Sequence, residues 1–131
     1  FAGYLPVDRQ ERADRLRALE QRSAAGDETV LVIETPYRTQ QLFDAMTAAL
    51  RPGTRIGIAR QLSLADELVA TRSVADWRRA PVVMPQVPTV FMLHAEPVAA
   101  NSRPHAAGHA NARPGRRDHA PAVGKRPPRG R

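Results

Sequence analysis

Residues 29–38 read Thr29-Val30-Leu31-Val32-Ile33-Glu34-Thr35-Pro36-Tyr37-Arg38, and within them the pattern changes from a strand to a helix start. Residues 29–33 are mostly β-branched and show no polar alternation, which predicts a strand buried on both faces. Thr35 followed by Pro36 is typical of a helix N-cap with proline at the first helical position. A strand that leads directly into a helix indicates an α/β fold.

A helix is expected on each side of this strand. Asp8 followed by Glu11 resembles a capping box and predicts a helix that ends at Gly26. Its apolar stripe is thin, so we expect most of its surface to be exposed. Apolar residues spaced by three and four predict a second helix over residues 36–50.

Three more strands follow in the pattern, at residues 54–59, 67–72 and 89–93. Ser73 is expected to cap a short helix between the last two of them. No internal repeat is visible. The sequence therefore predicts an α/β domain with a small, mostly buried sheet and flanking helices.

The charge distribution divides the chain into two parts. Residues 1–96 hold twelve arginines and twelve acidic residues, whereas residues 97–131 hold eight basic residues and one acid. The tail also has six prolines and only two valines as large aliphatic residues. Such a segment cannot bury enough apolar area to offset the entropy lost on ordering. We therefore expect one folded domain at 1–96 and a disordered basic tail at 97–131.

Several classes of site are disfavoured by what the sequence lacks. The chain has no cysteine, which excludes disulfides, thiolate catalysis and cysteine-ligated zinc. It has no run of ~18 apolar residues that would cross a membrane and no signal-peptide pattern, so we expect a cytoplasmic protein. Because it opens with Phe1 rather than Met, we expect a fragment or processed product. The sequence has no glycine-rich phosphate loop and no Ser–His–Asp set, so no independent catalytic centre is expected. His94 is the single histidine before the tail, so no metal site is expected.

Three segments stand out as candidates for chemistry. Residues 1–6, Phe1-Ala2-Gly3-Tyr4-Leu5-Pro6, form an apolar hook, for which the alternative is a strand or linker that packs its aromatic rings into the core. Residues 34–38 lie at the C-terminal end of a strand and open a helix, where free N–H groups suit an anion or polar ligand. Residues 59–63, Ala59-Arg60-Gln61-Leu62-Ser63, follow another strand and are expected at the same end of the sheet.

Two charged residues in these segments have competing interpretations. A carboxylate such as Glu34 at the end of a buried strand is costly unless it has a partner. It is either a ligand-binding group or simply paired with Arg38 or the helix N-terminus. Arg60 is suited to hold a phosphate or carboxylate, and the alternative is a surface salt bridge.

In this order and at these intervals, the three segments resemble the second domain of the tetrapyrrole-methylase family, in its branch of ribosomal RNA small-subunit methyltransferase I. The motifs of that branch read roughly FxGFLP, YE(S/A)PHR and ARELT, and the resemblance covers about residues 1–95. Four positions depart from the pattern: Ile33, Tyr37, Gln61 and Leu64. These departures favour a divergent paralogue of the ribosomal RNA enzyme. They leave a cytidine 2′-O-ribose as methyl acceptor open.

The resemblance implies a two-domain enzyme that holds S-adenosylmethionine (SAM) in the cleft between its domains. The first domain, with a GPGD-type loop, is not in this chain. The positions implied to contact the cofactor are Glu34, Thr35, Pro36, Ala59 and Thr89. Those implied to contact the substrate are Tyr4, Arg38 and Arg60. No catalytic residue is implied.

The expected partners follow from this interpretation. They are the missing N-terminal methyltransferase domain, RNA as a methyl acceptor, and a second copy of the chain, because an isolated half exposes an apolar cleft. The basic tail is either an RNA-phosphate contact or a solubilising terminus. The alternative function is a non-catalytic RNA-binding or regulatory module. A small hydrolase is disfavoured because no nucleophile–base pair is present.

Overall fold

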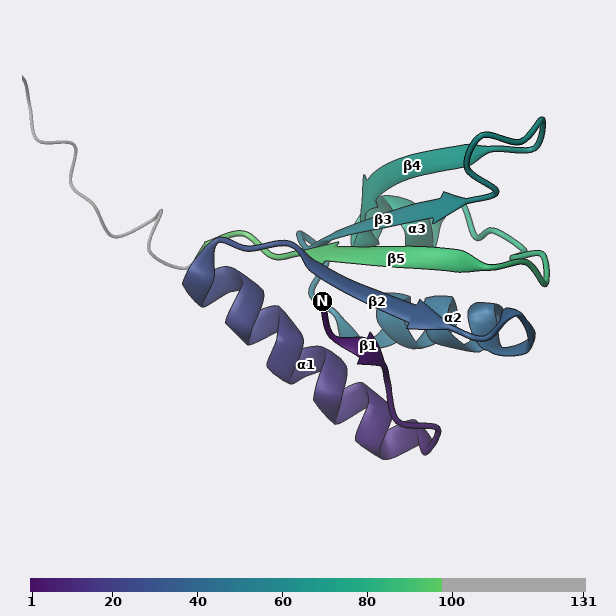
Figure 1. Ribbon diagram of the computed structural model, residues 1–131. Coiled ribbons are helices and arrows are strands. Elements are labelled where there is room, and N and C mark those ends of the chain that lie inside the picture. Colours follow the sequence, from purple (N-terminus) through teal and green to yellow (C-terminus); the bar gives the residue numbers. More distant parts are fainter. Residues whose placement is uncertain (98–131) are drawn as a thin grey trace, which may run out of the picture.

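The computed structural model describes residues 1–97, which form a five-stranded sheet with three α-helices on one face (Figure 1). The expected α/β class is confirmed. The tail expected to be disordered, residues 97–131, lies outside the described residues except for Pro97. The strands are β1 (Gly3–Tyr4), β2 (Val30–Glu34), β3 (Arg55–Arg60), β4 (Leu68–Ser73) and β5 (Thr89–His94). The helices are α1 (Arg9–Gly26), the 3₁₀ turn η1 (Pro36–Arg38), α2 (Thr39–Ala49) and α3 (Val74–Arg79).

The order of strands in the sheet is β1-β2-β5-β3-β4. β1 is parallel to β2, and every other neighbouring pair is antiparallel. The C-terminal ends of β1, β2 and β3 therefore meet the N-terminal ends of β4 and β5 at one end of the sheet. We call this the Glu34 end. There Glu34 lies opposite Thr89, and Thr89 lies opposite Arg60.

The two faces of the sheet differ in burial. Val32, Ile58 and Phe91 point toward the helices and are fully buried. Ile33 and Val90, on the opposite face, are only half-buried. The expectation of strands buried on both faces was therefore wrong. A continuous apolar run makes both faces apolar, but it does not supply a second layer of helices to cover them.

Helix α1 buries a wider stripe than its apolar residues suggest. Leu16 and Leu19 are buried as expected, but so are Arg12, Glu20 and Ser23. The carboxylate of Glu20 accepts hydrogen bonds from the backbone N–H of Arg51 at 2.8 Å and from the hydroxyl of Thr54. This buried acid joins α1 to the turn that precedes β3.

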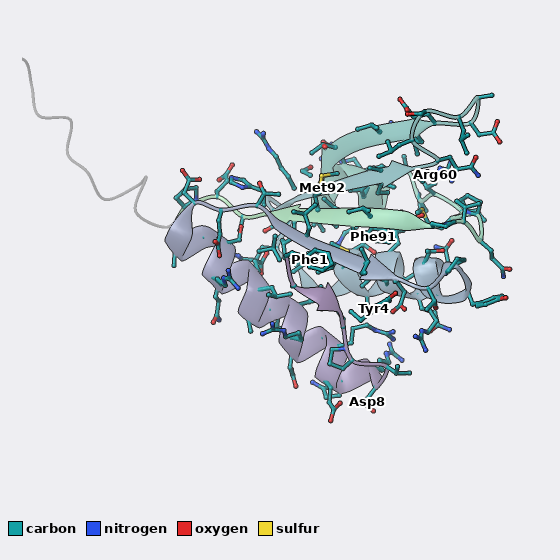
Figure 2. All side chains as sticks on the ribbon, in the orientation of Figure 1. Phe1, Tyr4, Asp8, Arg60, Phe91 and Met92 are labelled. Carbon is teal, nitrogen blue, oxygen red and sulfur yellow. The ribbon has the colours of Figure 1, made fainter. Side chains whose placement is uncertain are left out.

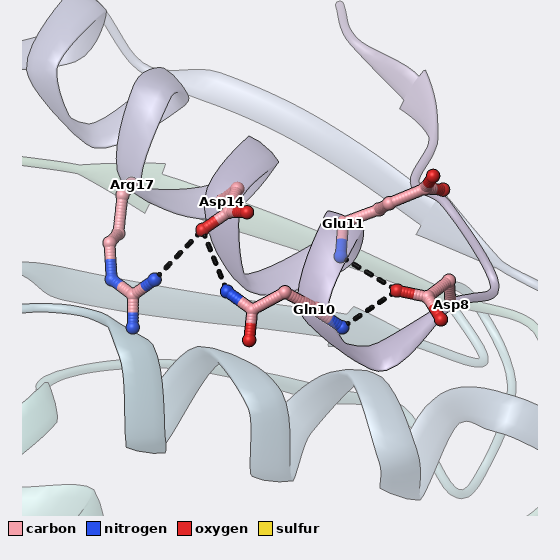
Figure 3. Close-up of polar contacts among 5 residues, drawn as sticks. All are labelled: Asp8, Gln10, Glu11, Asp14 and Arg17. Carbon is pink, nitrogen blue, oxygen red and sulfur yellow. Dashed lines mark hydrogen bonds and ion pairs between the residues drawn. The ribbon is translucent and has the colours of Figure 1, made fainter.

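The N-terminus of α1 is capped by Asp8, as the sequence predicted (Figure 3). Its Oδ1 accepts hydrogen bonds from the backbone N–H groups of Gln10 and Glu11, both at 2.9 Å. We expect Asp8→Ala to lower the free energy of unfolding by about 1 kcal/mol, because two N–H groups lose their acceptor. Urea denaturation measures this loss.

The matched control for the cap is Asp14→Ala, on the exposed surface of the same helix. Asp14 accepts from the side chains of Gln10 at 3.0 Å and Arg17 at 3.1 Å. Exposed pairs of this kind contribute only about 0.2–1 kcal/mol. If the two variants lose the same stability, Asp8 does not act as a cap.

Trp77 connects two helices to the sheet. Ser73 caps α3 as expected, since its hydroxyl oxygen accepts from the Asp76 N–H at 3.1 Å. The Trp77 indole N–H donates to the carbonyl of Ile56 at 3.0 Å. Its ring meets Phe43 of α2 edge-to-face, with centroids 5.4 Å apart. These contacts fix α2 and α3 against β3.

The N-terminal hook forms strand β1, so the alternative of a strand is confirmed. Its aromatic rings do not pack into the core, however, because Phe1 is 81% and Tyr4 64% exposed. Leu5 is the buried residue of the hook. Gly3 has a φ of 69°, a conformation that a side chain would disfavour. The hook therefore turns its rings toward solvent and leaves Tyr4 available at the Glu34 end of the sheet.

Candidate functional site

A cavity of about 690 Å³ lies at the Glu34 end of the sheet. Its walls come from the segments that follow β2 and β3 and the segment that precedes β5. Strand ends are where α/β sheets place ligands, because the backbone leaves the sheet there and opens a crevice. We call this the sheet-end cavity.

The sheet-end cavity brings together seven of the eight residues singled out from the sequence. They are Tyr4, Glu34, Thr35, Pro36, Ala59, Arg60 and Thr89. The eighth, Arg38, does not line the cavity, but its Nε donates to Glu34 Oε1 at 3.2 Å. Figure 2 shows Arg60 where the chain leaves β3. The contacts of these residues with cofactor and substrate remain predictions.

Glu34 is 5% exposed and has two differently occupied oxygens. Its Oε1 accepts from the Thr35 backbone N–H at 2.7 Å and from Arg38 Nε at 3.2 Å. Its Oε2 is buried and has no hydrogen-bond partner among the described residues. The sequence-based alternative of a structural pair is thus correct for one oxygen. The other oxygen still lacks a donor, which costs about 1–3 kcal/mol unless a ligand or water supplies one.

Arg60 offers the opposite charge nearby. Its Nη1 is buried and has no partner within residues 1–97. The alternative of a surface salt bridge for Arg60 is not observed among these residues. Thr89, which separates Arg60 from Glu34 in the register, is itself buried, and its hydroxyl donates to the Val87 carbonyl at 3.0 Å. Glu34 and Arg60 thus both line the cavity, and each has one unpartnered polar atom that is closed to solvent.

The loop after β3 supplies an apolar wall. Leu62 and Leu64 line the cavity and are 56% and 63% exposed. Gln61 and Ser63 adopt positive φ values of 50° and 67°, which non-glycine residues rarely do. The loop is held in this form because the Ser63 N–H donates to Glu67 Oε2 at 2.6 Å. Its two leucines offer a surface on which a flat ring can stack.

The expected helix start at residues 35–36 needs correction. Pro36–Arg38 form a 3₁₀ turn, and α2 begins only at Thr39. The Thr35 side chain makes no capping bond, and the Thr35 N–H is already held by Glu34. The Thr35 N–H is therefore not available to an anion or polar ligand.

His94 lies at the far end of the sheet from the cavity. Its Nδ1 is 3.2 Å from the Thr29 hydroxyl, and its Nε2 is 3.5 Å from Asp27 Oδ1. Among the described residues, no group of three or more histidine, aspartate or glutamate side chains is placed to hold a metal ion. None of the helices in residues 1–97 combines the length and apolar character needed to cross a membrane.

Other residues of the cavity were not singled out as site residues from the sequence. They include Ile33, Leu62, Leu64, Val87, Pro88 and Val90. Most are apolar, and apolar side chains of a cavity wall follow the same pattern as core residues. The connector before β5 carried a usable signal, because its prolines lead into a strand that begins where β2 and β3 end.

Comparisons with known proteins find a likeness at the level of solved structures. No protein-family model matches the chain, and no curated protein does. Among solved structures, the chain is similar to the crystal structure of the methyltransferase CobJ, with 17% sequence identity and a TM-score of 0.42. The match covers 72% of this chain and 41% of that chain, so this chain spans less than half the length of that protein.

Proposed function

We propose that this chain supplies one wall of the cofactor site of a SAM-dependent methyltransferase. One observation carries the proposal. Seven residues that the resemblance assigns to cofactor or substrate contact, separated by up to 85 positions from Tyr4 to Thr89, line a single cavity. Residues scattered in sequence that converge at one sheet end form the usual setting of a ligand site.

The residues of the cavity fit the groups that SAM presents. Glu34 Oε2 needs a hydrogen-bond donor, which the amine and hydroxyl groups of SAM offer. Arg60 Nη1 needs an acceptor, which the carboxylate of SAM offers. Leu62 and Leu64 provide an apolar surface for the adenine ring.

When bound, SAM supplies an activated methyl group that an acceptor atom attacks in line with the breaking carbon–sulfur bond. The contribution of this chain is to hold and orient the cofactor. Holding two reactants in line removes much of the entropic barrier to their reaction. Within this wall of the site, Glu34 and Thr89 are buried.

The proposal includes partners for the parts that the cavity lacks. A preceding N-terminal domain supplies the second wall and the glycine-rich loop, in a two-domain enzyme that works in the cytoplasm. RNA, including ribosomal RNA, is the proposed methyl acceptor, with the basic tail contacting its phosphates. A second copy of the chain covers apolar surface that a single copy exposes.

The test is isothermal titration calorimetry of the chain with S-adenosylhomocysteine, the stable product form of the cofactor. We expect wild-type protein to bind it with a dissociation constant below about 1 mM. Glu34→Gln should weaken binding by about tenfold to a hundredfold, because a charge-assisted hydrogen bond contributes about 1.5–3 kcal/mol. Thermal unfolding of each variant establishes that it is folded.

Glu28→Gln is the matched control for the binding test. Glu28 precedes β2 at the opposite end from Glu34 and pairs with Arg22 at 2.5 Å, so this variant should bind like wild type. If wild-type protein shows no binding at about 1 mM, the cofactor proposal fails. Binding of an RNA oligonucleotide without any affinity for the cofactor supports the non-catalytic RNA-binding module instead.

A further inference from the structure

A second groove lies between α1 and α2, away from the sheet-end cavity. Its volume is about 700 Å³, and we call it the α1/α2 groove. Its apolar lining consists of four alanines, Ala13, Ala45, Ala48 and Ala49. Arg12 of α1 also lines it. The proposed methyltransferase chemistry makes no use of this groove.

Arg12 carries a charge that the described residues leave unpaired. The side chain is only 6% exposed, and its Nε and Nη1 atoms are buried without a hydrogen-bond partner. A buried guanidinium normally has a carboxylate or several hydrogen bonds, because an unpaired buried charge costs several kcal/mol. Such an exception calls for an explanation, and a bound ion is one that accounts for it.

The nearby carboxylates are occupied by other partners. Asp8 caps α1 through Oδ1. Asp14 binds Gln10 and Arg17. Asp44 accepts from the side chain of Gln40 at 2.9 Å. None of the ion pairs within residues 1–97 includes Arg12, so its charge is open to a partner from outside them.

The charge of the groove limits the kind of anion that fits. Its lining contains the arginines Arg9, Arg12 and Arg17 and the aspartates Asp8 and Asp44. At most one positive charge is therefore in excess. A carboxylate carries a single negative charge, which matches this excess. A phosphate monoester carries about −1.5 to −2, which exceeds it and adds to the repulsion from the two aspartates. The alanines suit a short aliphatic group beside the anion.

We propose that the α1/α2 groove is a binding site for a carboxylate carried on a short aliphatic group, with Arg12 as the charged partner. The site is independent of the sheet-end cavity, so its test and the cofactor test can fail separately. Butyrate is the probe, since it combines one carboxylate with a short aliphatic chain.

The experiment follows the thermal unfolding of the full chain in sodium butyrate, sodium phosphate and sodium chloride at equal ionic strength. Wild-type protein and two variants are compared. Arg12→Met removes the charge but keeps an apolar stem. Arg15→Met removes an exposed arginine of the same helix that does not line the groove, and it reports the general effect of each salt.

Butyrate is expected to raise the melting temperature of wild-type protein and Arg15→Met by about 6–11 °C over chloride when it is tenfold above its dissociation constant. Arg12→Met should show no rise. An equal rise in all three proteins, or no rise in wild type, overturns the proposal. A larger, Arg12-dependent rise in phosphate overturns the carboxylate assignment in favour of a phosphate group.

A second measurement keeps the test decisive if Arg12→Met does not fold. Nitrogen-15 NMR spectra of wild-type protein are recorded during a butyrate titration. Amide signals of Ala13, Ala45 and Ala49 should move together, while those of Thr71 in β4 stay in place. Unmoved alanine signals at saturating butyrate contradict the site.

Discussion

Replacing Phe91 by alanine is expected to lower the free energy of unfolding by about 3–5 kcal/mol. Phe91 lies in the middle of β5, is fully buried, and stands between Val32 of β2 and Ile58 of β3 (Figure 2). Its removal leaves a hole in the helix-covered face at the centre of the sheet. Domains are stable by only about 5–15 kcal/mol, so the variant loses a large part of the total.

Urea denaturation followed by circular dichroism measures this loss, with Val90→Ala as the control. Val90 is the preceding residue of the same strand, but it faces the other way, is half-buried, and lines the sheet-end cavity. Its truncation should cost about 1 kcal/mol or less. Equal losses for Phe91→Ala and Val90→Ala would mean that the helices do not form the main core.

Glu20→Ala is expected to lower the free energy of unfolding by about 2–4 kcal/mol. The carboxylate is 5% exposed and accepts from both the Arg51 N–H and the Thr54 hydroxyl. Without it, both donors lose their acceptor, and the Thr54 hydroxyl is in a buried residue. The cost comes mainly from these orphaned donors and not from the ion pair, because the Arg51 side chain is 57% exposed.

A double-mutant cycle with Thr54→Val tests that explanation. If Glu20 and Thr54 interact directly, the two changes together should cost at least about 0.5–1 kcal/mol less than the sum of the single changes. Gln21→Ala, at the exposed neighbour of Glu20, should stay within about 0.5 kcal/mol of wild type. Strict additivity of the Glu20 and Thr54 changes would contradict the buried network.

Local pattern was sufficient to place most elements of the fold. The strands expected at 29–33, 54–59 and 67–72 are observed at 30–34, 55–60 and 68–73. The helix that Ser73 caps is also observed. These elements depend on residue types within a few positions of one another, and such signals are present in the chain itself.

The misses share a different cause, which is dependence on distant parts of the chain. The periodicity of the apolar strands does not indicate whether a second layer covers them, so the half-exposed face of the sheet was not predicted. Whether the ring of Tyr4 packs into the core or faces solvent was left open for the same reason. Arg12 was overlooked although it stands four residues before Leu16, the spacing of one helix face. The burial of Arg12 against the rest of the fold is a tertiary property, whereas the acids around it pair within four positions of the chain.

The candidate site was predictable in position but not in electrostatic detail. The order of three motifs was enough to select residues that meet at one sheet end. The same motifs could not predict that one Glu34 oxygen is hydrogen-bonded and the other is not, because this difference depends on where Arg38 and the Thr35 N–H lie. Fine hydrogen-bond geometry follows from the packed structure and has no counterpart in residue spacing.

The central place of β5 has a consequence for synthesis of the protein. β5 is the last strand of the described region to leave the ribosome, yet it is the strand that joins β2 to β3. A nascent chain that ends before Thr89 therefore holds β1–β2 and the β3–β4 hairpin as separate pieces with two unpaired edges. Such edges invite pairing with other chains. We expect the growing chain to expose these two edges until His94 has emerged from the exit tunnel.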